Sequence, residues 1–91
     1  MKQIIITIYG RVQGVFFRDG VKREADKLNL VGWTRNTPEG TVEVLAEGEE
    51  ENLKKLLDYC KEGPKFAKVE EVKVKWSEAS GEFNEFMIKY D

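Results

Sequence analysis

The order of strand-like and helix-like segments along the chain is the feature that most constrains its fold. Alternating apolar residues, as at Ile4, Ile6 and Ile8, predict strands. Those strands are expected over residues 3–9, 30–36, 41–47, 69–76 and 83–90. Apolar residues spaced three and four apart predict just two helices, over residues 18–29 and 49–62. Because two helices can cover only one face of such a sheet, the order indicates an α+β fold.

The expected architecture is a ferredoxin-like two-layer sandwich. Its element order is β-α-β-β-α-β with an extra C-terminal strand, and its sheet is mainly antiparallel with both helices on one face. On the last two strands, one face is expected to present Val72, Val74 and Trp76, and Phe86, Ile88 and Tyr90. The aromatic residues at strand positions are expected to be buried or half-buried rather than to form a platform for nucleic-acid bases: Trp33, Trp76 and Tyr90.

Composition and charge narrow the class of protein. The 91 residues suffice for a single domain over 1–91, and no apolar stretch approaches the ~20 residues that a membrane span needs. Lysine and arginine number 15 against 17 acidic residues, and the net charge of −2 argues against a general nucleic-acid binder. The lone cysteine, Cys60, cannot form an internal disulfide, and it falls in the apolar stripe of the second helix. We therefore expect a cytoplasmic monomer without membrane or nucleic-acid partners.

The segment from Arg11 to Arg18 is the strongest candidate for a functional site. It joins a strand to a helix, so its backbone N–H groups and the helix dipole can converge on an anion. Gly14 lets the loop curl tightly, and the guanidinium of Arg18 could grip two phosphate oxygens at once. A glycine pair with a nearby arginine is also common in ordinary connections, so the loop alone indicates only an anion site. Three apolar anchors predict that the loop is packed and rigid: Val12, Val15 and Phe17.

A second motif follows on the next hairpin. The chain reads Gly-x-Val-Gln-Gly-Val-x-Phe-Arg over residues 10–18 and Gly-Trp-x-x-Asn-x-x-x-Gly-x-Val over residues 32–42. In this order, with one helix between them, the motifs resemble those of the acylphosphatase family. The resemblance covers essentially the whole chain, including the Phe-x-Ile-x-Tyr strand near the C-terminus. Thr34 departs from the alanine, valine or cysteine more usual at its position, and we interpret it as a packing variation.

The resemblance implies an activity and a set of site residues. The family hydrolyses the carboxyl-phosphate bond of acyl phosphates and uses neither a metal nor an organic cofactor. Carried over by motif, Arg18 binds the phosphate and Asn36 positions the attacking water. Inorganic phosphate is then both the product and a competitive inhibitor. The implied phosphate cradle is the backbone of Gln13, Gly14, Val15, Phe16 and Phe17, together with Arg18.

The chemistry suits these residue types. The departing carboxylate is a weak base, so little general-acid help is needed. The absence of histidine, which excludes a Ser-His-Asp triad or a Cys-His pair, is therefore no obstacle. The carboxamide of Asn36 cannot take a proton at neutral pH, but its oxygen can orient a water in line. Thr41 could hydrogen-bond and orient Asn36 across the hairpin, although threonine is also simply a good strand residue. Taken without the first motif, Asn36 would be interpreted as a cap of the Thr-Pro turn.

Other classes of function stay open at this point. A small-anion or nucleotide-binding regulatory domain of the same fold would keep Arg18 and the cradle but would not need Asn36. An RNA-binding domain would need exposed aromatic residues on the central strands and a basic surface, and neither is evident in the sequence. A unit of this kind could also belong to a larger carbamoyl-transfer protein, although 91 residues predict that the chain stands alone.

Overall fold

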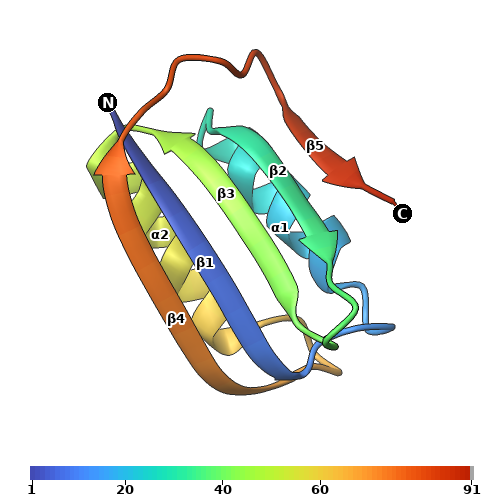
Figure 1. Ribbon diagram of the computed structural model, residues 1–91. Helices are drawn as coiled ribbons and strands as arrows, with labels where there is room; N and C mark the ends of the chain where they lie inside the picture. The colour runs from blue at the N-terminus through green and yellow to red at the C-terminus, as the bar shows by residue number, and fades with distance from the viewer. Residues whose placement is uncertain (91) are drawn as a thin grey trace.

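The chain folds with the predicted order of elements. A computed structural model describes residues 1–90, within which there are five strands and two helices (Figure 1). The expected bounds agree with the observed ones to within two residues, except at the start of the last strand. The elements are β1 (Lys2–Arg11), α1 (Phe17–Lys27), β2 (Val31–Asn36), β3 (Val42–Gly48), α2 (Glu50–Glu62), β4 (Lys68–Glu78) and β5 (Phe86–Lys89).

The strands form one sheet in the order β4-β1-β3-β2-β5. Neighbouring strands are antiparallel, apart from β2 and β5, which are parallel. Figure 1 shows α1 and α2 together on one face of this sheet. The arrangement confirms the predicted ferredoxin-like sandwich. Within residues 1–90, neither helix has the length and apolar character that crossing a membrane requires.

The core lies between the two helices and the inner face of the sheet. Fully buried isoleucines of β1 stand opposite small or branched residues of β3, with Ile6 paired to Val44. Burial raises the pKa of the Cys60 thiol to about 12, which agrees with its expected role as a small apolar residue. Each helix contributes one buried apolar stripe: Phe17, Val21 and Ala25 from α1, and Leu53, Leu56 and Cys60 from α2.

The two edge strands correct the sequence prediction. Val74 and Trp76 face the helical layer, but they are 38% and 39% exposed because β4 has a neighbouring strand on one side only. β5 is four residues long rather than eight, since it pairs only with the short segment 32–35 of β2. Tyr90 lies beyond the end of β5 and is 73% exposed, so its predicted burial is wrong. Trp33 is half-buried, as expected.

A crossover of residues 79–85 connects β4 to β5 and is fixed by one buried carboxylate. Glu47 of β3 accepts hydrogen bonds from the Gln3 Nε2 atom at 2.6 Å and the Ser80 backbone N–H at 2.7 Å. The Ser80 hydroxyl at 2.8 Å and the Gly81 N–H at 3.1 Å also donate to it. Burial raises the pKa of Glu47, but these hydrogen bonds outweigh it and hold the pKa below its usual value. The carboxylate thus fixes the path that leads to β5.

Candidate active site

The loop between β1 and α1 is packed on one side and open on the other. Its predicted anchors Val12, Val15 and Phe17 are buried in the core, so the expected rigidity has a structural basis. Gly14 has φ +74°, the left-handed conformation that glycine adopts at little cost. Phe16 also has a positive φ, +64°, which the sequence prediction missed because phenylalanine seldom adopts it.

The loop ends in an open helix N-terminus. The first helical backbone hydrogen bond runs from the Gly20 N–H to the Phe16 carbonyl at 3.2 Å. The N–H groups that precede it in α1 have no acceptor within the helix. Phe16 is the N-cap residue, and its side chain has no polar atom that could accept from them. An anion at this point would therefore meet backbone donors and the positive end of the helix dipole.

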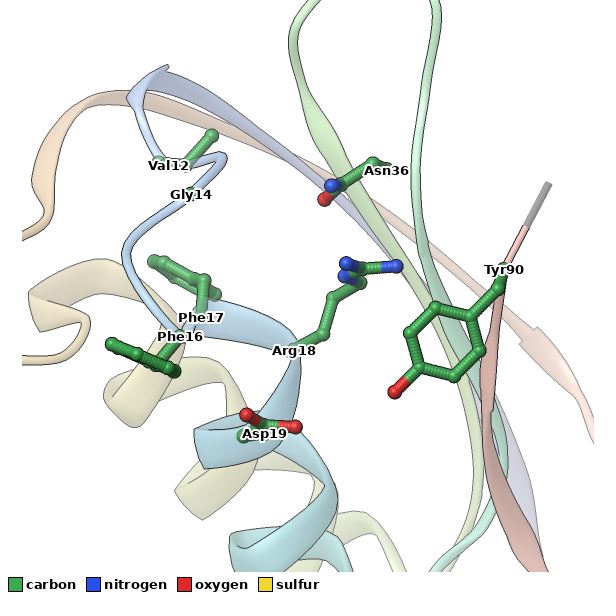
Figure 2. Close-up of a pocket in the computed structure, with 8 residues that line it drawn as sticks. All are labelled: Val12, Gly14, Phe16, Phe17, Arg18, Asp19, Asn36 and Tyr90. Atoms are coloured by element: carbon green, nitrogen blue, oxygen red, sulfur yellow. The ribbon is translucent and has the colours of Figure 1, made fainter.

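Arg18 projects from the first turn of α1 across the mouth of this loop. Its Nη1 atom donates to the Lys89 carbonyl at 3.2 Å, and its Cζ atom lies 4.9 Å from the centroid of the Tyr90 ring. Figure 2 shows the guanidinium between the loop and Tyr90. The end of β5 therefore holds Arg18 in place. The sequence prediction missed Lys89 and Tyr90, because only their position at the end of an alternating strand hinted at a contact with the helical layer.

Asn36 is the last residue of β2, and it carries an unpaired polar atom. Its side-chain Oδ1 is buried and, among the described residues 1–90, has no hydrogen-bond partner. Buried oxygens of this kind are nearly always paired, so such an atom marks a candidate functional group. The alternative interpretation of Asn36 as a turn cap fails, because the turn is held by other bonds. The Thr37 N–H donates to the Thr41 carbonyl at 2.9 Å, and the Gly40 N–H donates to the Thr37 carbonyl at 3.1 Å.

The prediction that Thr41 hydrogen-bonds to Asn36 is wrong, because within residues 1–90 the Thr41 hydroxyl pairs with Thr37 instead. The Thr41 hydroxyl lies 2.6 Å from the Thr37 hydroxyl, and the Thr41 N–H donates to that same Thr37 oxygen at 3.2 Å. The two threonines face each other across the mouth of the turn, so each satisfies the other. Thr41 therefore shapes the turn that follows Asn36 through its hydrogen bonds to Thr37.

Gln13 ties the loop to this turn through its side chain. Its Nε2 atom donates to the carbonyls of Thr37 and Thr41, both at 2.9 Å. The loop between β1 and α1 and the hairpin that carries Asn36 are thus fixed relative to each other. The sequence prediction placed only the backbone of Gln13 at the site. The side-chain role was missed because its partners are main-chain carbonyls, which leave no signature in sequence.

One hollow of about 280 Å³ brings most of the predicted residues together. That volume is close to the lower end of the range for small-molecule sites. Gln13, Val15 and Thr41 do not line it, because they face the hairpin, the core and the turn. Figure 2 shows the eight lining residues: Val12, Gly14, Phe16, Phe17, Arg18, Asp19, Asn36 and Tyr90.

Comparison with known proteins finds relatives that belong to one family. The family model described as acylphosphatase matches residues 4–88. The chain is 43% identical over 91 residues to the acylphosphatase of Methylococcus capsulatus, covering 100% of this chain and 99% of that protein. It is 49% identical over 90 residues to the acylphosphatase of Bacillus licheniformis, covering 99% and 100%. The crystal structure of acylphosphatase from Bacillus subtilis aligns with a TM-score of 0.95 at 43% identity, over 99% of this chain and 100% of that one.

Proposed function

Because the chain belongs to the acylphosphatase family, we propose that Arg18 and Asn36 carry the chemistry of its reaction. The chain is a hydrolase with acylphosphatase activity, and acyl phosphates are its substrate class. In the proposed mechanism a water attacks phosphorus in line with the bond to the acyl oxygen. That bond breaks with its electron pair on the departing carboxylate, and the products are a carboxylate and inorganic phosphate.

Phosphate binding falls to Arg18 and the loop amides. The planar guanidinium matches two phosphoryl oxygens, and the unpaired N–H groups at the start of α1 face the remaining charge. Arg18 is already directed across the hollow by the Lys89 carbonyl and the Tyr90 ring. Less conformational freedom is therefore lost when the phosphate binds. Charge that develops on the phosphoryl oxygens during bond cleavage meets donors that are in place beforehand.

The buried, unpaired Oδ1 of Asn36 is the observation that carries the proposal. A carboxamide oxygen accepts hydrogen bonds, and a water that donates to it would be fixed against the hollow that Arg18 borders. Asn36 orients this water without removing its proton. In the proposed mechanism the proton passes to a phosphate oxygen of the substrate. Gln13 and Thr41 support this arrangement from outside the hollow, since they fix the loop and the turn on either side of Asn36.

Every group named here comes from a single chain, so we also propose that the enzyme works as a monomer. Inorganic phosphate should occupy the same cradle as the substrate and compete with it. A binding domain without catalysis would share the cradle, so phosphate binding alone does not separate the two functions. Turnover does.

The direct test is hydrolysis of benzoyl phosphate in metal-free buffer, with inorganic phosphate as competitor. We expect turnover that phosphate inhibits competitively. Arg18→Ala should lower kcat/KM by about 10³-fold and abolish phosphate inhibition, because the main charged contact is lost. The control is Arg23→Ala, an exposed position on the same helix, which should behave like the wild type. A folded wild-type protein that binds phosphate without turning over benzoyl phosphate would contradict the proposal.

A further inference from the structure

Phe16 combines two energetically unfavourable features. Its backbone is left-handed, with φ +64° and ψ +27°, although it is neither glycine nor asparagine. Its side chain is 73% exposed, so the ring gives up the stabilisation that burial would provide. The core side of the loop is already filled by Val12, Val15 and Phe17. Backbone strain and an exposed ring at one residue are typical of a position retained for contact with a ligand.

The position of Phe16 within the hollow indicates which part of the ligand it would contact. Figure 2 shows Asn36 at one end of the hollow, with the Arg18 guanidinium close to it, and Phe16 with Asp19 toward the other end. In-line displacement places the attacking water and the leaving group on opposite sides of phosphorus. If the water is held at Asn36, the acyl group leaves toward the end of the hollow where Phe16 lies.

We propose that the ring of Phe16 contacts the acyl group of the substrate and makes the enzyme prefer acyl phosphates with an apolar, above all aromatic, acyl group. The proposal rests on the proposed function, because the direction of the acyl group follows from the water held by Asn36. An exposed phenyl ring offers apolar area and an aromatic face to a neighbouring ring. A two-carbon acyl group is too short to cover that face. The contact therefore separates large acyl groups from small ones rather than acyl phosphates from other phosphates.

Tyr90 is the competing candidate, because it is the other exposed aromatic residue that lines the hollow. It lies beside Arg18, whose guanidinium stacks on its ring. Loss of the Tyr90 ring should therefore act through Arg18 and affect every acyl phosphate alike. This difference makes Tyr90→Ala the matched control for Phe16.

The test measures kcat/KM for benzoyl phosphate and for acetyl phosphate in the wild type, Phe16→Gly, Phe16→Leu and Tyr90→Ala. Glycine adopts the φ of Phe16 freely, so the loop should keep its path in Phe16→Gly. We expect the benzoyl-to-acetyl ratio to fall by about five-fold in Phe16→Gly and by less in Phe16→Leu. In Tyr90→Ala both constants should fall while the ratio stays near the wild-type value. Effects on phosphate binding that both substrates share cancel in the ratio.

Two results would overturn the proposal while leaving the proposed function intact. One is a wild-type ratio in Phe16→Gly with both substrates still hydrolysed. The other is a ratio that falls in Tyr90→Ala instead, which would give the acyl contact to Tyr90. A wild-type enzyme that hydrolyses neither substrate would refute the proposed function, and the acyl contact with it.

Discussion

Two connections at opposite ends of the sheet treat their polar groups in opposite ways (Figure 1). At one end, three donors from the crossover of residues 79–85 and one from Gln3 of β1 surround the Glu47 carboxylate. At the other, the loop before α1 leaves helix N–H groups open and faces an unpaired Asn36 Oδ1. The first arrangement is what stability requires. The second gives up hydrogen bonds that the fold could have used, and it surrounds a hollow. Unpaired polar groups therefore mark the candidate site of this protein, whereas the fully hydrogen-bonded carboxylate of Glu47 supports the fold.

Outside Arg18 and Asn36, the largest effect on activity should come from removing the hydrogen bonds between the loop and the hairpin. Gln13→Ala removes both hydrogen bonds to the turn, so the cradle and Asn36 lose their fixed separation. We expect kcat/KM for benzoyl phosphate to fall by about 10²-fold, as small misplacements of reacting groups do. Gln3→Ala is the matched control at the other end, since it removes one donor to Glu47. Equal activity losses in the two variants would show that the link through Gln13 has no special role at the candidate site.

The crossover should respond in stability rather than in activity. Glu47→Gln replaces a buried carboxylate that accepts four hydrogen bonds, and we expect it to lower the free energy of unfolding by about 2 kcal/mol. Urea denaturation measures this change. Glu43→Gln, on the same strand and in an ion pair with a partly exposed Arg35, should lower it by about 0.5 kcal/mol. A drop in kcat/KM that exceeds the change in stability would contradict a purely structural role for Glu47.

The same carboxylate should make stability depend on pH. Because hydrogen bonds hold the pKa of Glu47 below its usual value, its contribution is complete above the unfolded pKa, about 4.3. It is lost as the pH falls through the lower pKa of the folded state. Wild type and Glu47→Gln should therefore differ most in unfolding free energy at neutral pH and converge in acid. If the difference in unfolding free energy stayed constant down to strongly acidic pH, the pKa of Glu47 would not be lowered in the folded state.

The smallest effect should be a gain in stability at the strained residue. Phe16→Gly relieves a positive φ that phenylalanine seldom adopts, and we expect the free energy of unfolding to rise by about 0.5 kcal/mol. Asn29→Gly is the control, because Asn29 has φ +56° but asparagine tolerates this conformation. Its gain should be smaller. A clear loss of stability in Phe16→Gly would show that the ring has a structural role.

Local patterns were enough to predict the fold. The alternating residues of β1 and the apolar stripes of the two helices indicate the two-layer fold. These patterns involve residues close together in the sequence, so they can be recognised without the structure. At the candidate site, the sequence predicted the tight loop conformation at Gly14. The two motifs also predicted that Arg18 and Asn36 belong to one site, and both line the same hollow. Contacts between distant segments were not predictable, as with Tyr90 on Arg18 and Gln13 on the turn. The hydrogen-bond partner of the Thr41 hydroxyl was also not predictable, since it is Thr37 rather than Asn36.

In the proposed mechanism the unpaired oxygen of Asn36 holds the attacking water, and Arg18 binds the phosphate. The most direct test measures kcat for benzoyl phosphate and the inhibition constant of inorganic phosphate in Asn36→Ala, with Asn84→Ala on the crossover as control. We predict that kcat falls by about 10²-fold or more while the inhibition constant changes by less than about three-fold. Retention of wild-type kcat in Asn36→Ala would contradict the role of Asn36 in holding the water. A loss of phosphate inhibition as large as the loss of turnover would show that Asn36 binds the phosphate instead.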